Sequence, residues 1–238
     1  MTTPAHPSRP QQLAKRSLVA GVVATALVGT LAAGCAPEPV AHTNPDEGKP
    51  VIVMVDRDVP HQLVLGSLYN QALTHAGYTS ALRTQVAPTF GTRLSWITTG
   101  DADVVVVCSG ELLTQLSPAK AAELSEEYVA DRAAGRIEKN SWDWQERVFT
   151  EMAKVLPSMM MATEPSNAQS CEQTTDLELP QNVVPIVRKT KGDKALRTVL
   201  NNVSGTVSTS DIHELTNGVL MTGVVTGSVA DYLLTHGL

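Results

Sequence analysis

Cysteine and histidine are the residue types in this chain best able to do chemistry, as nucleophiles, metal ligands or proton carriers. The chain has 3 cysteines and 6 histidines, and the histidines are scattered without any His-x-x-x-His pair. The sequence also lacks a Gly-x-Ser-x-Gly motif and a phosphate-binding glycine loop. We therefore expect no enzymatic activity, no metal site and no cofactor. The remaining chemistry is lipid attachment and ligand binding.

The first of the three cysteines, Cys35, follows a segment with the layout of an export signal. Residues 1–16 contain no acidic residue and end in a Lys-Arg pair, and residues 17–33 form an uncharged run rich in valine, alanine and leucine. A positive flank, an apolar core and small residues before a cleavage site are typical of a secretory signal peptide. The alternative is an uncleaved membrane anchor, because the apolar run is near the lower limit of lengths that span a bilayer.

The sequence Leu-Ala-Ala-Gly-Cys at 31–35 resembles a bacterial lipobox, with Ala32 where the strict pattern has a large aliphatic residue. This resemblance implies removal of residues 1–34 as a signal peptide and lipidation of Cys35. Several acyl chains on one cysteine would give stable anchoring. We expect a protein attached by lipid to the outer, extracytoplasmic face of the cell membrane.

The rest of the chain divides into a tether and one folded region. Residues 35–50 are rich in proline and have little apolar periodicity, which predicts a flexible tether. Residues 51–238 are enough for a single substantial domain. The formal net charge is -6 and no Lys/Arg cluster stands out, so nucleic acid is not expected as a partner.

Strands and helices alternate along the folded region, which predicts an α/β fold with a mostly parallel sheet and flanking helices. Strands are expected at 51–55, 82–86, 103–108, 157–163 and 182–188. Helices are expected at 61–77, 89–99, 109–116, 118–135, 142–154, 192–202, 208–217 and 227–236. Gly77 and Gly100 favour helix ends, and Ser208 with Asp211 fits a capping box.

Two blocks of sequence, 51–113 and 182–238, together resemble the extracytoplasmic substrate-binding proteins of ABC importers for glycine betaine, choline and other quaternary amines. The first has His61-Gln62-Leu63-Val64-Leu65-Gly66 at a helix start, Ala76-Gly77-Tyr78 at its end and Gly100-Asp101-Ala102-Asp103 before the next strand. The second has Val183-Val184-Pro185-Ile186-Val187-Arg188, Val203-Ser204-Gly205, Thr209-Ser210-Asp211-Ile212-His213-Glu214-Leu215 and His236-Gly237-Leu238 in the family's order. The resemblance implies one lobe of a type II periplasmic-binding-protein-like fold, an ABC permease as partner and a quaternary amine as ligand.

The sequence departs from the family in length. Members have two lobes, and the chain enters the second lobe after the strand that corresponds to 157–163. Here only residues 164–181 separate that strand from the next, which is the length of a loop. We expect residues 51–163 and 182–238 to form one lobe, with 164–181 as a short connection in place of the second.

The expected ligand site lies in the loops beyond the carboxyl ends of the strands. The candidate binding residues are Asp58, His61, Gln62, Ser109, Gly110 and Asn167. Helix N-termini at His61 and Ser109 would offer backbone N–H groups to a carboxylate. The alternative is that these are ordinary loop and cap residues.

Aromatic rings, which bind quaternary ammonium groups, are scarce in the expected site. Cys108 stands where the family has a tyrosine, and aromatic residues make up only 4% of the chain. Tyr69, Tyr78 and Trp96 are expected to pack within the fold. Trp142 and Trp144 are the exceptions that could face a cleft.

In the family, the loops that contain Cys108 and Cys171 both line the cleft, and in an oxidising exterior two remaining thiols are more often bridged than free. We therefore expect a Cys108–Cys171 disulfide.

Two functions stay open. The first is a lipid-anchored solute-binding component of an importer for glycine betaine or choline-type osmoprotectants. The second is a one-lobe envelope scaffold that acts through the permease or a full-length paralogue.

Overall fold

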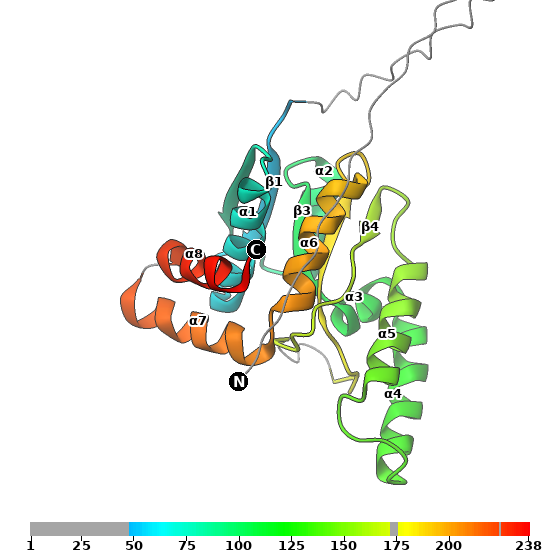
Figure 1. Ribbon diagram of the computed structural model, residues 1–238. Coiled ribbons are helices and arrows are strands. Elements are labelled where there is room, and N and C mark those ends of the chain that lie inside the picture. The colour runs from blue at the N-terminus through cyan, green and yellow to red at the C-terminus, as the bar shows by residue number, and fades with distance from the viewer. Residues whose placement is uncertain (1–47, 172–175, 224) are drawn as a thin grey trace, which may run out of the picture. The chain divides into compact units, whose positions relative to one another are not determined.

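The computed structural model describes residues 48–171, 176–223 and 225–238 (Figure 1). All of them belong to one compact unit, Thr43–Leu238. The expected signal peptide, the lipidated Cys35 and most of the tether lie outside the described residues. Among the described residues, no helix is long and apolar enough to cross a membrane.

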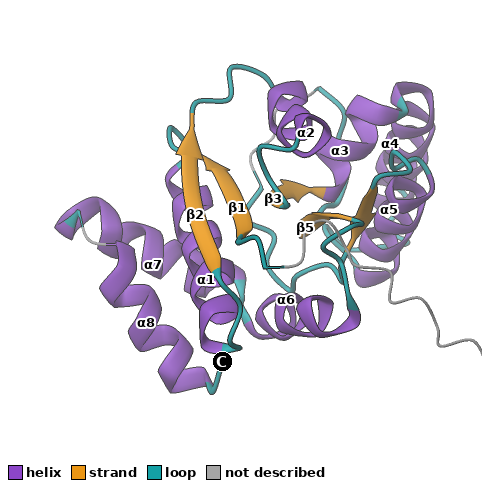
Figure 2. Cartoon of the chain, turned by 90° about the horizontal axis from the view of Figure 1, so that it is seen from above, coloured by secondary structure: helices purple, strands orange, loops and turns teal. Residues whose placement is uncertain are grey.

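A five-stranded sheet in the order β2-β1-β3-β5-β4 forms the centre of the fold (Figure 2). Its strands are β1 (Val51–Asp56), β2 (Ser80–Gln85), β3 (Val104–Cys108), β4 (Met160–Ala162) and β5 (Val183–Arg188). β1 is parallel to β2 and β3, whereas β5 is antiparallel to both β3 and β4. Four strands therefore run the same way and β5 runs back between two of them.

The helices cover both faces of the sheet. Their bounds are α1 (Pro60–His75), α2 (Phe90–Thr99), α3 (Ser109–Leu116), α4 (Pro118–Ala133), α5 (Trp142–Lys154), α6 (Lys194–Thr206), α7 (Thr209–Thr222) and α8 (Val225–His236). Helices α1, α6, α7 and α8 lie on one side of the sheet, and α2 to α5 lie on the other (Figure 2). The predicted α/β class is confirmed.

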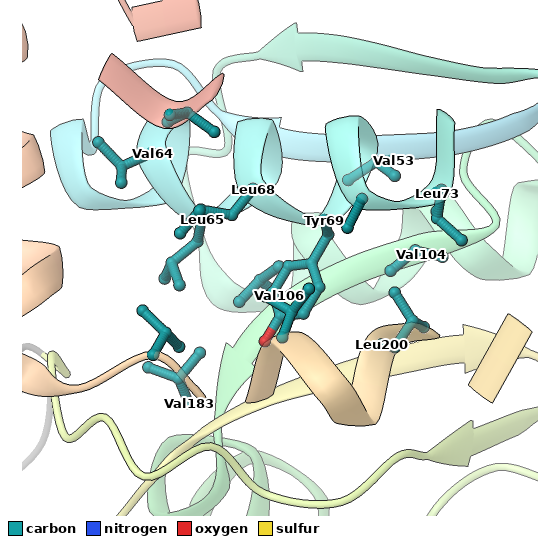
Figure 3. Close-up of a cluster of buried hydrophobic side chains, with 14 of the residues drawn as sticks. Val53, Val64, Leu65, Leu68, Tyr69, Leu73, Val104, Val106, Val183 and Leu200 are labelled. Atoms are coloured by element: carbon teal, nitrogen blue, oxygen red, sulfur yellow. The ribbon is translucent and has the colours of Figure 1, made fainter. Parts of the chain in front are cut away.

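The two cores follow from the alternation of side chains along buried strands. In β3, Val104 and Val106 face the core under α1, while Val105 and Val107 face the core under α3 and α5. Figure 3 shows the first of these cores, in which Tyr69 of α1 points toward α6. Its hydroxyl group lies 3.1 Å from Ser204 Oγ, and burial raises the pKa of this phenol.

Several helix ends lie where the sequence predicts them. Gly100 ends α2 with a left-handed φ of 90°, a conformation that costs glycine little. Ser208 and Asp211 form the predicted capping box at the start of α7. Three boundaries differ: α6 continues to Thr206, α7 continues to Thr222, and α8 begins two residues early at Val225.

The connection between β4 and β5 has no helix or strand among its described residues. It is held along β5, since Thr163 N donates to Pro185 O and Ser166 N donates to Val183 O. Because the chain stays at the sheet edge where β4 ends, it must enter β5 from that same edge. This is the physical reason that β5 runs opposite to its neighbours.

Candidate functional site

The carboxyl ends of β1, β3 and β4 and the start of β5 all lie at one edge of the sheet. The strand register pairs Cys108, the last residue of β3, with Val183, the first of β5. Helices α1 and α3 begin at this edge, directly after β1 and β3. Open α/β sheets bind their ligands at this kind of edge.

The predicted disulfide is confirmed at this edge. Cys108 and Cys171 are bonded, with their Cα atoms 5.9 Å apart. The bond ties the last residue of β3 to the connection between β4 and β5. The connection is therefore fixed across the strand ends, where the sequence predicts the ligand site.

The N-terminus of α3 is occupied by the connection itself. Gln181 Oε1 accepts a 3.1 Å hydrogen bond from Glu111 N, and it lies 3.0 Å from the position of a Cβ on Gly110. Ser109 is fully buried, and its Oγ accepts a 3.1 Å hydrogen bond from Asn182 N. In this structure Ser109 and Gly110 therefore contact the chain's own connection.

Three other predicted site residues serve local structure. Gln62 is buried, and its Oε1 accepts a 3.1 Å hydrogen bond from Asp56 N. Asp58 is exposed, and its backbone N donates to Asp56 Oδ1 at 3.1 Å. Asn167 is exposed and donates from Nδ2 to Gly205 O. The structure does not bring these three side chains together around a pocket.

His61, the remaining predicted residue, lines a pocket of about 580 Å³. The other described lining residues come from the connection and from α7, and they are Gln169, Ser170, Cys171, Thr209, His213, Thr216 and Asn217. Sequence reasoning missed the α7 residues, although the block 209–215 was part of the resemblance. The pocket has the volume of a small-molecule site.

Two hydroxyl groups of this pocket are buried and have no hydrogen-bond partner among the described residues. They are Ser170 Oγ and Thr216 Oγ1. Ser170 is only 8% exposed. Thr209 Oγ1 accepts a 2.9 Å hydrogen bond from Gln169 N, so its own proton remains available for donation. The pocket thus offers several hydroxyl donors that the protein does not use.

A charged cluster lies beside the pocket edge of the sheet, and the sequence gave no signal that its members meet. Arg93 of α2 lies 3.7 Å from Asp56 and 3.6 Å from Glu111, and all three side chains are largely buried. The guanidinium group also lies 5.7 Å from the centre of the Phe90 ring. One cation between two carboxylates holds the end of β1, α2 and the start of α3 together.

The aromatic side chains mostly pack, as predicted. Tyr69 and Trp96 are buried. Trp144 is also buried and makes an edge contact with Tyr128 at 5.4 Å between ring centres. Trp142 is exposed on α5. No aromatic ring is among the described residues that line the 580 Å³ pocket, and no group of three metal-ligating side chains occurs in the described ranges.

No family model matches the sequence, and no curated protein matches it. Among solved structures, apo YehZ from Escherichia coli has a TM-score of 0.58 at 11% identity, covering 79% of this chain and 99% of that chain. A glycine betaine/carnitine/choline ABC transporter structure has a TM-score of 0.57 at 9% identity, covering 79% of this chain and 98% of that chain. The chain therefore has a periplasmic-binding-protein-like fold.

Proposed function

We propose that this chain is a solute-binding component of an ABC importer, attached by lipid on Cys35 to the extracytoplasmic face of the cell membrane. The observation that carries the proposal is the pocket of about 580 Å³ lined by His61 at the ligand-binding edge of the sheet. The fold likeness to structures of ABC-transport binding proteins supports it. The partner in this proposal is the importer's permease.

The proposal includes a single lobe. Residues 164–181 take the place of a second lobe, which is supported by their hydrogen bonds along β5 and by the disulfide at Cys171. Solute capture in two-lobed receptors relies on closure of one lobe on the other. One lobe with a fixed connection would hold a solute from one side, so we expect micromolar affinity.

The solute class in the proposal is the glycine betaine and choline type of osmoprotectant. Its members combine a trimethylammonium group with a carboxylate or a hydroxyl group. The hydroxyl groups of Ser170 and Thr216 can donate to a carboxylate or hydroxyl oxygen. His61 and His213 add imidazole groups to the same pocket.

Calorimetric titration of the mature lipoprotein in detergent tests this proposal. The solutes are glycine betaine, choline, carnitine and proline betaine. Saturable heat at micromolar concentration with at least one of them is the expected result. His213→Gln should weaken that binding about tenfold, as loss of one hydrogen bond does, whereas His75→Gln, an exposed site at the far end of α1, should not change it.

A second function, an envelope scaffold acting through a protein partner, is favoured by one observation. Gln181 and Leu179 fill the N-terminus of α3, which is one of the two helix ends that could receive a solute. The scaffold predicts no heat with any solute from a folded sample. It also predicts crosslinks in intact cells from a photoreactive residue at the exposed position 142 to the permease or to a two-lobed paralogue.

A further inference from the structure

The pocket lined by His61 differs in charge from the chain around it. The chain has a formal net charge of -6, yet no aspartate or glutamate is among the described residues that line this pocket. No aromatic ring lines it either. A cation in this pocket would meet neither a carboxylate nor a ring face, the two groups that stabilise buried cations.

The same pocket has unused hydrogen-bond donors. Ser170 Oγ and Thr216 Oγ1 are buried without a partner in the described part of the chain. A buried polar group without a partner costs about 1–3 kcal/mol. A bound group that accepts hydrogen bonds would remove that cost, and a carboxylate accepts up to about four of them.

The N-terminus of α1 adds a positive electrostatic contribution on one side of the pocket. α1 has 16 residues, its N-cap Val59 provides no side-chain cap, and its first turn has no acidic residue. The partial positive charge of this helix end is therefore not neutralised locally. α7, which forms the opposite wall, instead begins with a capping box that includes Asp211.

We infer that this pocket recognises a small carboxylate through hydrogen bonds, and that it has no recognition of quaternary ammonium groups. The inference rests on the proposed function, because it assigns the solute class of the same pocket. The carboxylate can belong to a free organic acid or to a zwitterion such as a betaine. In either case the cationic part contributes no affinity.

Three compounds of similar shape separate the two chemistries. Glycine betaine has a carboxylate and a trimethylammonium group, tert-butylacetate keeps the carboxylate and replaces the cation with a neutral group, and choline keeps the cation without a carboxylate. In calorimetric titrations of the mature lipoprotein, glycine betaine and tert-butylacetate are expected to bind within about tenfold of each other. Choline is expected to bind at least about a hundredfold more weakly, as loss of two charge-assisted hydrogen bonds implies.

Substitutions in the pocket test where the carboxylate binds. Ser170→Ala and Thr216→Val each remove one hydroxyl group, and each should weaken tert-butylacetate binding about tenfold. Thr222→Val on the exposed end of α7 is the matched control and should leave the affinity unchanged. Circular dichroism of each variant establishes that it is folded before titration. Unchanged affinity in both folded pocket variants would overturn the assignment.

The outcomes also separate this inference from the proposed function. Choline binding as tightly as glycine betaine, with no heat from tert-butylacetate, would overturn the inference and leave the importer function standing. If none of the three binds, a thermal-shift screen of neutral sugars, polyols and amino acids decides. Stabilisation by one of these overturns only the inference, and no stabilisation by any of them overturns both.

Discussion

Gln181 Oε1 accepts a hydrogen bond of 3.1 Å from the backbone N of Glu111, which lies 70 positions earlier in the chain. The side chain thereby acts as a cap for α3 that comes from a distant segment. Helix N-termini have unpaired N–H groups, and a side-chain oxygen satisfies one of them. The short connection thus stabilises the helix end that would otherwise be open to solvent or to a solute.

Replacing Gln181 with alanine should therefore destabilise the protein by about 1–2 kcal/mol, the cost of losing a cap in a partly buried position. Urea denaturation monitored by circular dichroism measures the change. Gln115→Ala is the matched control, because Gln115 is exposed on the same helix and should change stability by less than about 0.5 kcal/mol. Equal effects of the two substitutions would contradict the capping role.

The Cys108–Cys171 disulfide closes a loop with a sequence separation of 63 residues. On the chain-entropy account, a loop of this length stabilises the fold by about 4 kcal/mol. The double variant Cys108→Ala/Cys171→Ala should lose about that amount in urea denaturation. The unsubstituted protein in excess dithiothreitol should show the same midpoint as the variant, and a reductant-insensitive midpoint would show that the bond contributes little.

Local features of the fold could be predicted from the sequence because they depend on a few neighbouring residues. Gly100 ends α2 since it tolerates the left-handed conformation. The capping box of Ser208 and Asp211 depends only on residues three positions apart. The four valines of β3 predict a buried strand because each face of it meets a core.

The direction of β5 and the composition of the pocket could not be predicted in the same way. β5 runs backwards because the connection stays at one edge of the sheet, which is a property of the path of the chain. The pocket combines His61 with His213, which are far apart in sequence. The ion pairs of Arg93 with Asp56 and Glu111 likewise join three separate elements. Spacing along the chain does not reveal such contacts.

Arg93 is expected to be the most important member of that charged cluster. Arg93→Met would leave two largely buried carboxylates without their cation, and removing one partner of a buried pair is strongly destabilising. We expect a loss of about 2–3 kcal/mol in urea denaturation, less than for a fully buried pair because the guanidinium group is partly exposed. Arg83→Met on the exposed side of β2 is the control and should cost less than about 0.5 kcal/mol.

A double variant tests whether the charge itself is responsible. Adding Glu111→Gln to Arg93→Met removes one of the two unpaired carboxylates and should recover part of the lost stability. If the double variant is less stable than Arg93→Met alone, packing of the arginine side chain is the main contribution, and the electrostatic account of the cluster fails.

Asp211 should make the stability of α7 dependent on pH. Burial acts to raise the pKa of its carboxyl group, but hydrogen bonds from Ser208 and Tyr232 outweigh it and hold the pKa below the ordinary value of 3.8. A carboxyl group with a depressed pKa in the folded state contributes fully above its unfolded pKa and loses that contribution as the pH falls through the folded value. Asp211→Asn should cost about 1 kcal/mol at neutral pH.

Denaturation midpoints measured from pH 7 down to the acid limit of folding test this sign. The difference between the unsubstituted protein and Asp211→Asn should shrink as the pH falls below 3.8, because the aspartate is then protonated. Asp231→Asn, on the neighbouring helix α8, is the control. A difference that stays constant with pH would mean that the carboxylate charge at the start of α7 contributes nothing.

Gly66 allows α1 to lie close to the sheet. A Cβ at this position would be 2.5 Å from Val55 Cγ1 and 2.9 Å from Leu82 Cδ1, closer than atoms can approach. Gly66→Ala should therefore destabilise the protein by about 2–3 kcal/mol through overpacking, despite the better helix propensity of alanine. At Gly218 of α7 an added Cβ meets nothing within 4 Å, so Gly218→Ala should stabilise by up to about 1 kcal/mol. Opposite shifts of the two urea midpoints are the expected result, and a shift of both in the stabilising direction would mean that α1 can move away from β1 at little cost.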